Sequence, residues 1–172
     1  KPVRSLVLDR WVYATPAFAL RDFVVTTDGI LSRTEIEQTA GVRPGQNVLA
    51  LDLPTLRDRL AAHPRIASIS LERRLPGSLR IDIRERTPVA RISVLQLSDV
   101  CVTYLLDEAG YAMLPLAPGL SDSSVVEEER LLPLLTYTGS IALSPGSAVS
   151  HPAVMAALRL ITAFDRSDMA SV

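Results

Sequence analysis

The sequence predicts an α+β fold in which two helices cover one face of a small mixed three-stranded sheet. Three observations lead to this prediction. Residues 32–41 and 52–62 each combine a helix-capping residue with helical periodicity. Residues 66–85 contain two runs of alternating apolar residues around a strong turn signal. An apolar run at residues 18–27 can supply the remaining strand.

The first elements follow in chain order. Residues 3–13 predict a short lead-in helix, and residues 18–27, rich in Phe and Val, predict the first strand, which ends at the turn Asp28-Gly29. Ser32 and Glu35 have the spacing of a capping box, in which each side chain accepts a hydrogen bond from the other residue's backbone. A helix should run from there to about residue 40.

The second helix is predicted from its cap and its leucines. Residues 47–51 form a brief apolar segment, expected to be extended, and Asp52 then caps a helix with Pro54 in its first turn. Leu56 and Leu60 lie one turn apart and should face the core.

An antiparallel hairpin follows. Ile69 belongs to its first strand, Ile81 belongs to its second, and Leu75-Pro76-Gly77-Ser78 forms the turn between them. The opposite face should be solvated, since it carries only polar residues: Glu72, Arg74, Arg80, Asp82 and Arg84.

Residues beyond 88 predict a second, β-rich unit. Strands are expected at residues 89–95, 101–106 and 111–114, with the turn Asp107-Glu108-Ala109-Gly110 before the last. Residues 116–129 are expected to be a loop that ends in a solvated run of three glutamates. A final helix should begin near residue 150, with Val154, Leu158 and Ile161 on one face.

Charge is unevenly distributed along the chain. The formal net charge is -1, with 18 basic and 19 acidic residues, so the molecule lacks the basic excess expected of a nucleic-acid-binding protein. Nine arginines lie in residues 57–91, whereas residues 92–129 contain seven acidic residues and no basic one. The change of sign indicates a boundary between two units near residue 90.

The residues do not predict an enzyme, a cofactor or a metal site. Cys101 lies in a predicted strand among valines and is expected to be a buried structural thiol. His63 and His151 are far apart in sequence and lack zinc-ligand spacing, and no phosphate-binding glycine motif is present. A hydrolase would need a cluster of polar residues that the sequence does not show.

One family shares the motifs of residues 18–90. The sequence Arg73-Arg74-Leu75-Pro76, the alternation at 79–83 and above all Glu85-Arg86-Thr87-Pro88-Val89-Ala90 resemble the POTRA domain of FtsQ/DivIB cell-division proteins. Asp107-Glu108-Ala109-Gly110 and Leu132-Pro133-Leu134-Leu135 resemble segments of the β domain of that family. The resemblance implies a lead-in at residues 1–17, a POTRA domain at 18–88 and an incomplete β domain at 89–172.

The resemblance also implies a function. Such a protein would be a non-enzymatic scaffold of the divisome, on the periplasmic or extracytoplasmic side of the inner membrane at the septum. It would be anchored by a transmembrane segment upstream of Lys1 and would contact partners of the FtsB and FtsL type. The partner-binding strand of the β domain would lie beyond Val172. No run of this chain approaches the roughly 20 apolar residues that a membrane-spanning helix needs.

Two kinds of surface are candidates for binding. An edge strand of the first sheet, either residues 79–86 or residues 18–27, could pair with an extended segment of a partner. Exposed arginines could steer an acidic partner, or could instead pair with neighbouring acidic residues. The candidate arginines are Arg57, Arg59, Arg65, Arg73, Arg80 and Arg84. A POTRA module of an outer-membrane barrel-assembly or two-partner secretion protein is the alternative function.

Overall fold

The computed structural model describes residues 16–95, 101–115, 123–137, 141 and 143–167. The chain divides into two compact units, residues 1–85 and residues 86–172, and each has its own sheet and hydrophobic core. The helix expected at residues 3–13 lies outside the described residues.

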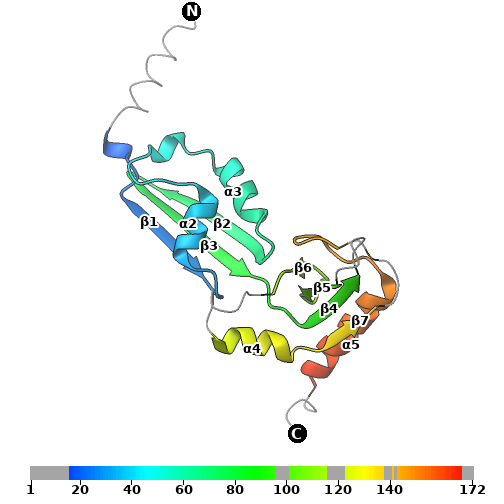
Figure 1. Cartoon of the computed structure of the whole chain (residues 1–172). Coiled ribbons are helices and arrows are strands. Elements are labelled where there is room, and N and C mark those ends of the chain that lie inside the picture. The colour runs from blue at the N-terminus through cyan, green and yellow to red at the C-terminus, as the bar shows by residue number, and fades with distance from the viewer. Residues whose placement is uncertain (1–15, 96–100, 116–122, 138–140, 142, 168–172) are drawn as a thin grey trace, which may run out of the picture. The chain divides into compact units, whose positions relative to one another are not determined.

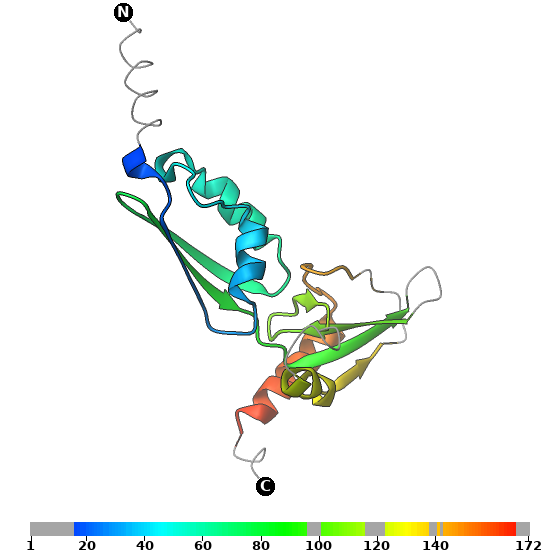
Figure 2. The same cartoon turned by 60° about the vertical axis from the view of Figure 1, so that its left-hand side comes forward.

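Unit 1 has the predicted α+β architecture (Figures 1 and 2). Its strands are β1 (Asp22–Thr27), β2 (Ile66–Arg74) and β3 (Ser78–Glu85), and its helices are α2 (Arg33–Ala40) and α3 (Leu53–Ala61). The strand order is β1-β3-β2, with β3 parallel to β1 and antiparallel to β2. Both helices cover the same face of the sheet, so the predicted mixed sheet with two helices is confirmed.

The helix caps explain where both helices begin. The Ser32 hydroxyl accepts a hydrogen bond from the Glu35 amide at 3.2 Å, and Gly41 ends α2 in a left-handed conformation with φ 66°. The Asp52 carboxylate accepts bonds from the Thr55 amide and hydroxyl and so caps α3. Residues 47–51 are not extended as expected, since Val48–Ala50 form a short 3-10 helix, η2, capped by the Asn47 side chain.

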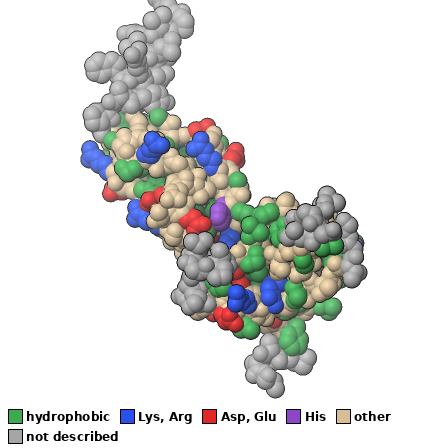
Figure 3. Space-filling model, viewed as in Figure 1, with side chains coloured by type: hydrophobic (Ala, Val, Ile, Leu, Met, Phe, Trp, Pro, Cys, Tyr) green, Lys and Arg blue, Asp and Glu red, His purple; other side chains and the backbone are tan. Residues whose placement is uncertain are grey.

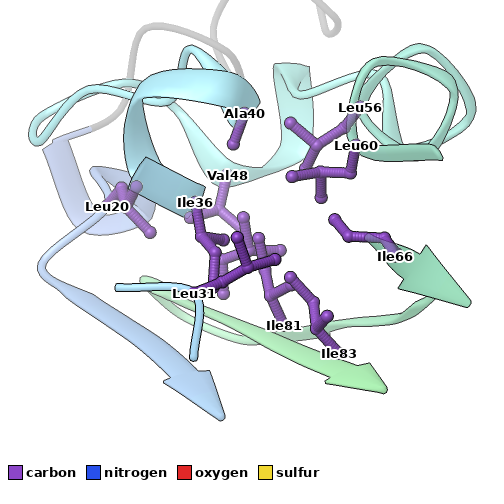
Figure 4. Close-up of a cluster of buried hydrophobic side chains, with 11 residues drawn as sticks. Leu20, Leu31, Ile36, Ala40, Val48, Leu56, Leu60, Ile66, Ile81 and Ile83 are labelled. Carbon is purple, nitrogen blue, oxygen red and sulfur yellow. The ribbon is translucent and has the colours of Figure 1, made fainter. Parts of the chain in front are cut away.

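The core of unit 1 lies between the helices and the sheet (Figure 4). The predicted alternation is confirmed on β3, where Leu79, Ile81 and Ile83 are buried. Leu56 and Leu60 of α3 are buried above them. Side chains from the helix face and the sheet face therefore fill one core, as the spacing of the leucines requires.

Unit 2 contains a four-stranded sheet in the order β6-β5-β4-β7. The strands are β4 (Ala90–Leu95), β5 (Cys101–Leu106), β6 (Ala112–Met113) and β7 (Leu134–Thr136), and the helices are α4 (Ser123–Leu131) and α5 (Pro152–Asp165). Val154 and Leu158 of α5 are buried, and Ile161 packs partly buried against the same core. A short 3-10 helix, η1 (Pro16–Phe18), begins the described part of unit 1.

The prediction of a loop at residues 116–129 is wrong from residue 123 onward, because helix α4 occupies Ser123–Leu131. The solvated run of three glutamates is also wrong at Glu129, which is 5% exposed, whereas Glu127 and Glu128 are exposed. Successive residues of a helix point about 100° apart, so three adjacent glutamates cannot all face the same direction. Residues 116–122 lie outside the described residues.

Candidate protein-binding surface

The first sheet has two edges, β1 and β2, because β3 runs between them. The expectation that residues 79–86 form an edge is therefore wrong. The parallel pairing of β1 with β3 joins segments more than 50 residues apart, and no local sequence signal reports it. Residues 18–27 remain a candidate edge through β1, and β2 is a new one.

The β1 edge is partly occupied by a side chain of α2. The Arg33 guanidinium donates to the Phe23 carbonyl oxygen at 2.8 Å and to the Glu37 carboxylate at 2.6 Å. Glu37 lies one turn along α2 and therefore holds the guanidinium in place. An incoming strand would have to displace Arg33 in order to pair with Phe23.

The β2 edge carries outward backbone groups at alternate residues. The Asp22 amide donates to the Gly77 carbonyl oxygen, so the backbone groups of odd-numbered β3 residues face β1. The backbone groups of even-numbered β3 residues therefore face β2, where they pair with even-numbered β2 residues. The backbone groups of Ile69, Leu71 and Arg73 consequently point away from the sheet. In the part of the chain that the structure describes, no hydrogen bond reaches these groups, and β2 extends over nine residues.

Side chains along β2 leave this edge accessible. Ala67, Ser68 and Ser70 are exposed and short. Ser68 and Ser70 pair with Arg84 and Asp82 of β3. A short, exposed side chain does not screen the backbone, so a second strand can approach β2 without displacing protein groups.

Three of the candidate arginines lie near α3 and β2. Arg57 and Arg59 are exposed on α3, and Arg73 is exposed on β2, where its guanidinium donates to the Leu51 carbonyl oxygen. Arg59 lines a shallow hollow of about 170 Å³ together with Asp52 and Thr55. The Thr55 hydroxyl, which donates to Asp52, lowers the pKa of that carboxyl, and the charges of Arg73 and Arg59 act in the same direction.

Arg65 is not an exposed member of this group, because only 7% of its surface is accessible. The expectation that Arg65 is one of the exposed arginines is therefore wrong. Arg65 directly precedes the first residue of β2, so it does not belong to the exposed face of α3 that carries Arg57 and Arg59.

Arg80 and Arg84 lie on the face of the sheet opposite the helices, and both contact acidic groups. The Arg80 guanidinium donates to both oxygens of Asp82 at 3.0 and 2.8 Å, and this bond lowers the pKa of Asp82. Arg84 lies 3.8 Å from Asp28. Arg80 thus pairs within β3, whereas Arg84 pairs with a residue of the turn after β1. Basic and acidic side chains are interspersed over unit 1 (Figure 3).

The Glu85 carboxylate organises the loop between β1 and α2. It accepts hydrogen bonds from the Ile30 amide at 3.0 Å, from the Leu31 amide at 2.9 Å and from the Thr27 hydroxyl. A Cβ atom on Gly29 would lie 2.4 Å from the Glu85 side chain, so glycine permits this close approach. The first residue of the Glu85-Arg86-Thr87-Pro88 motif therefore closes unit 1.

Arg86 performs a corresponding role in unit 2. Its guanidinium lies 3.8 Å above the centre of the Tyr111 ring and donates to Asp107 at 2.7 Å. The other Asp107 oxygen accepts the amides of Ala109 and Tyr111 and so fixes the turn that the sequence predicts. Two adjacent residues of one motif thus stabilise two different units.

The residues considered for catalysis are dispersed. Cys101 is exposed at the start of β5, so the expectation of a buried thiol is wrong. His63 lies 3.6 Å from Glu35, and His151 bonds the Tyr137 hydroxyl at 3.0 Å. Within the described ranges, no three His, Cys, Asp or Glu residues are grouped to hold a metal ion. None of the helices there combines the length and apolar character that a membrane span requires.

Comparison of the sequence with known proteins agrees with this architecture. Residues 18–86 match the POTRA domain of the FtsQ type. Proteins named cell division protein FtsQ are 37% identical over 109 residues in Mycobacterium bovis, 33% over 132 in a Geobacter species and 30% over 159 in Myxococcus fulvus. These matches cover 63%, 76% and 82% of this chain.

Unit 1 is therefore a POTRA domain of the FtsQ type. The chain belongs to the FtsQ/DivIB family of cell division proteins. Its matches span 34%, 43% and 53% of the length of the three relatives, so it corresponds to about a third to a half of such a protein.

Proposed function

We propose that this chain is the extracytoplasmic part of a division scaffold, which acts by binding other proteins and transforms no substrate. The observation that carries the proposal is the open β2 edge of an FtsQ-type POTRA domain. A partner segment that pairs with Ile69, Leu71 and Arg73 would satisfy the outward backbone groups of β2. In this proposal the protein works at the septum, anchored in the inner membrane by a segment outside this chain.

The family resemblance suggests the partners. Proteins of the FtsB and FtsL type would bind through the β domain, at a strand beyond Val172, while the POTRA domain would help to bring the protein to the division site. The β2 edge is the surface that unit 1 offers for this purpose, because Arg33 occupies part of the β1 edge.

Arg73→Pro tests the role of the β2 edge. Proline removes an outward N–H without removing a bond to β3, so the sheet should persist while strand addition is impaired. We expect a fluorescent full-length protein carrying Arg73→Pro to lose most of its septal signal. Arg73→Ala is the matched control, since it removes the same side-chain bond to Leu51 but keeps the N–H.

Septal recruitment of Arg73→Pro equal to that of Arg73→Ala, with both variants folded by circular dichroism, would rule out this edge. Arg33→Ala should leave recruitment intact, because it alters only the β1 edge.

Exposed arginines of α3 should affect the rate of association. Arg57→Glu combined with Arg59→Glu reverses two exposed charges without disturbing the core, so partner capture should slow, and the effect should shrink as ionic strength rises. Stopped-flow or surface-based kinetics with purified division partners measures this. An association rate that is unchanged at low salt would exclude steering by these residues.

A further inference from the structure

One exposed face of α5 carries large apolar side chains. The helix buries Val154 and Leu158, whereas Leu160 is 74% exposed and Phe164 is 54% exposed. Leu160 and Phe164 are four residues apart and so lie on one stripe. Two large apolar side chains on one exposed stripe of a helix indicate a contact surface.

A basic flank borders this stripe. Arg159 and Arg166 line a hollow of about 370 Å³ beside the turn that contains Glu108. Arg166 binds Glu108 at 2.9 Å. Arg159 has no ion-pair partner among the described residues, so the face offers one uncompensated positive charge next to Leu160.

Helix α4 of the same unit has the complementary features. Leu131 is 76% exposed, and the exposed residues Glu127 and Glu128 lie one turn before it. Glu127 lies 4.0 Å from Arg130, whereas Glu128 has no ion-pair partner in the described part of the chain. Helix α4 thus presents an apolar end and an uncompensated negative charge about one turn apart.

We propose that unit 2 self-associates, with α4 of one copy packed on the α5 face of another. Leu131 of one copy contacts Leu160 and Phe164 of the other, and Glu128 pairs with Arg159. Charge complementarity selects a second copy as the occupant, because the α5 face is apolar and basic while α4 is apolar and acidic. Each copy carries both faces, so the contact can form twice in a symmetric dimer.

Such an interface is small, so the association is weak and transient. Sedimentation equilibrium of this chain, from about 10 µM to about 1 mM, should show a concentration-dependent dimer. Leu160→Asp should raise the dimer Kd about tenfold or more, because it places a charge in the apolar contact. Arg43→Glu, which alters an exposed charge of unit 1, is the control and should leave the Kd unchanged.

A charge exchange tests the orientation of the contact. Arg159→Glu and Glu128→Arg should each raise the Kd about two- to fivefold at low salt, and the double variant should restore it. Arg159 and Glu128 are both exposed, so these variants should unfold at the temperature of the original chain. A chain that stays monomeric to about 1 mM overturns the proposal, as does a dimer that is insensitive to Leu160→Asp or a double variant that is not rescued.

Discussion

At the scale of single residues, the motif at residues 85–88 works through hydrogen bonds. Glu85 holds the loop after β1, and Arg86 holds the turn at Asp107. The Glu85 carboxylate accepts hydrogen bonds from two backbone amides and one hydroxyl. Replacing Glu85 would leave these three donors without that acceptor, which costs free energy of folding. The motif is therefore a structural device, and a role in binding is not required to explain it.

Glu85→Ala should destabilise unit 1 by about 1–3 kcal/mol, because three donors lose a charged acceptor. Urea unfolding followed by circular dichroism measures the change. Glu72→Ala is the matched control, since the Glu72 carboxylate pairs with the exposed Arg74 and its loss should cost less than about 0.5 kcal/mol. Equal losses for the two variants would contradict the role given to Glu85.

The exposure of single residues at the ends of strands was harder to predict than the buried face of a strand. The alternation on β3 gave the buried set correctly, because one face of that strand meets the helices. Arg65 and Cys101 were assigned the wrong environment, since both lie at the first residues of a strand or just before it. At such positions the direction of the side chain depends on the path of the chain, which hydrophobic periodicity does not report.

At the scale of elements, local signals located both helices of unit 1. Ser32 and Asp52 cap the two helices as predicted, and α2 ends at Ala40, where the sequence places its end. The central position of β3 could not be predicted, because its parallel pairing with β1 is a long-range contact. Helix α4 was missed because its serines and glutamates suggest a solvated loop, although glutamate is a good helix former.

The cap of α3 predicts a pH effect. The pKa of Asp52 is lowered in the folded chain, chiefly by the Thr55 hydroxyl, so this carboxylate stabilises the fold above its unfolded pKa of about 3.9. The contribution is lost as pH falls through the lower folded value. Asp52→Asn keeps a capping oxygen but does not titrate.

Unfolding of the two chains should therefore be compared at about pH 7 and about pH 3. The original chain should lose more stability than Asp52→Asn between these values, because other carboxylates titrate equally in both. Equal losses would show that the cap does not depend on the charge of Asp52.

At the scale of the whole molecule, the described ranges contain no group of three His, Cys, Asp or Glu residues placed to hold a metal ion. The fold class, the two helices on a mixed sheet and the family were predictable, because capping, alternation and the motif at residues 85–90 are local. The proposed binding edge could not be predicted, because it depends on which strand lies in the middle of the sheet and on the Arg33 guanidinium, which occupies part of the β1 edge.

Site-specific photo-cross-linking in dividing cells tests the binding edge most directly. A photoreactive residue at Ser68 or Ser70 of the full-length protein should cross-link to another division protein, identified by mass spectrometry, because both side chains are exposed on β2. The same residue at Val24 or Thr26, exposed on β1, should give little product. Cross-links from β1 alone, or from neither strand while the protein remains at the septum, would contradict the account.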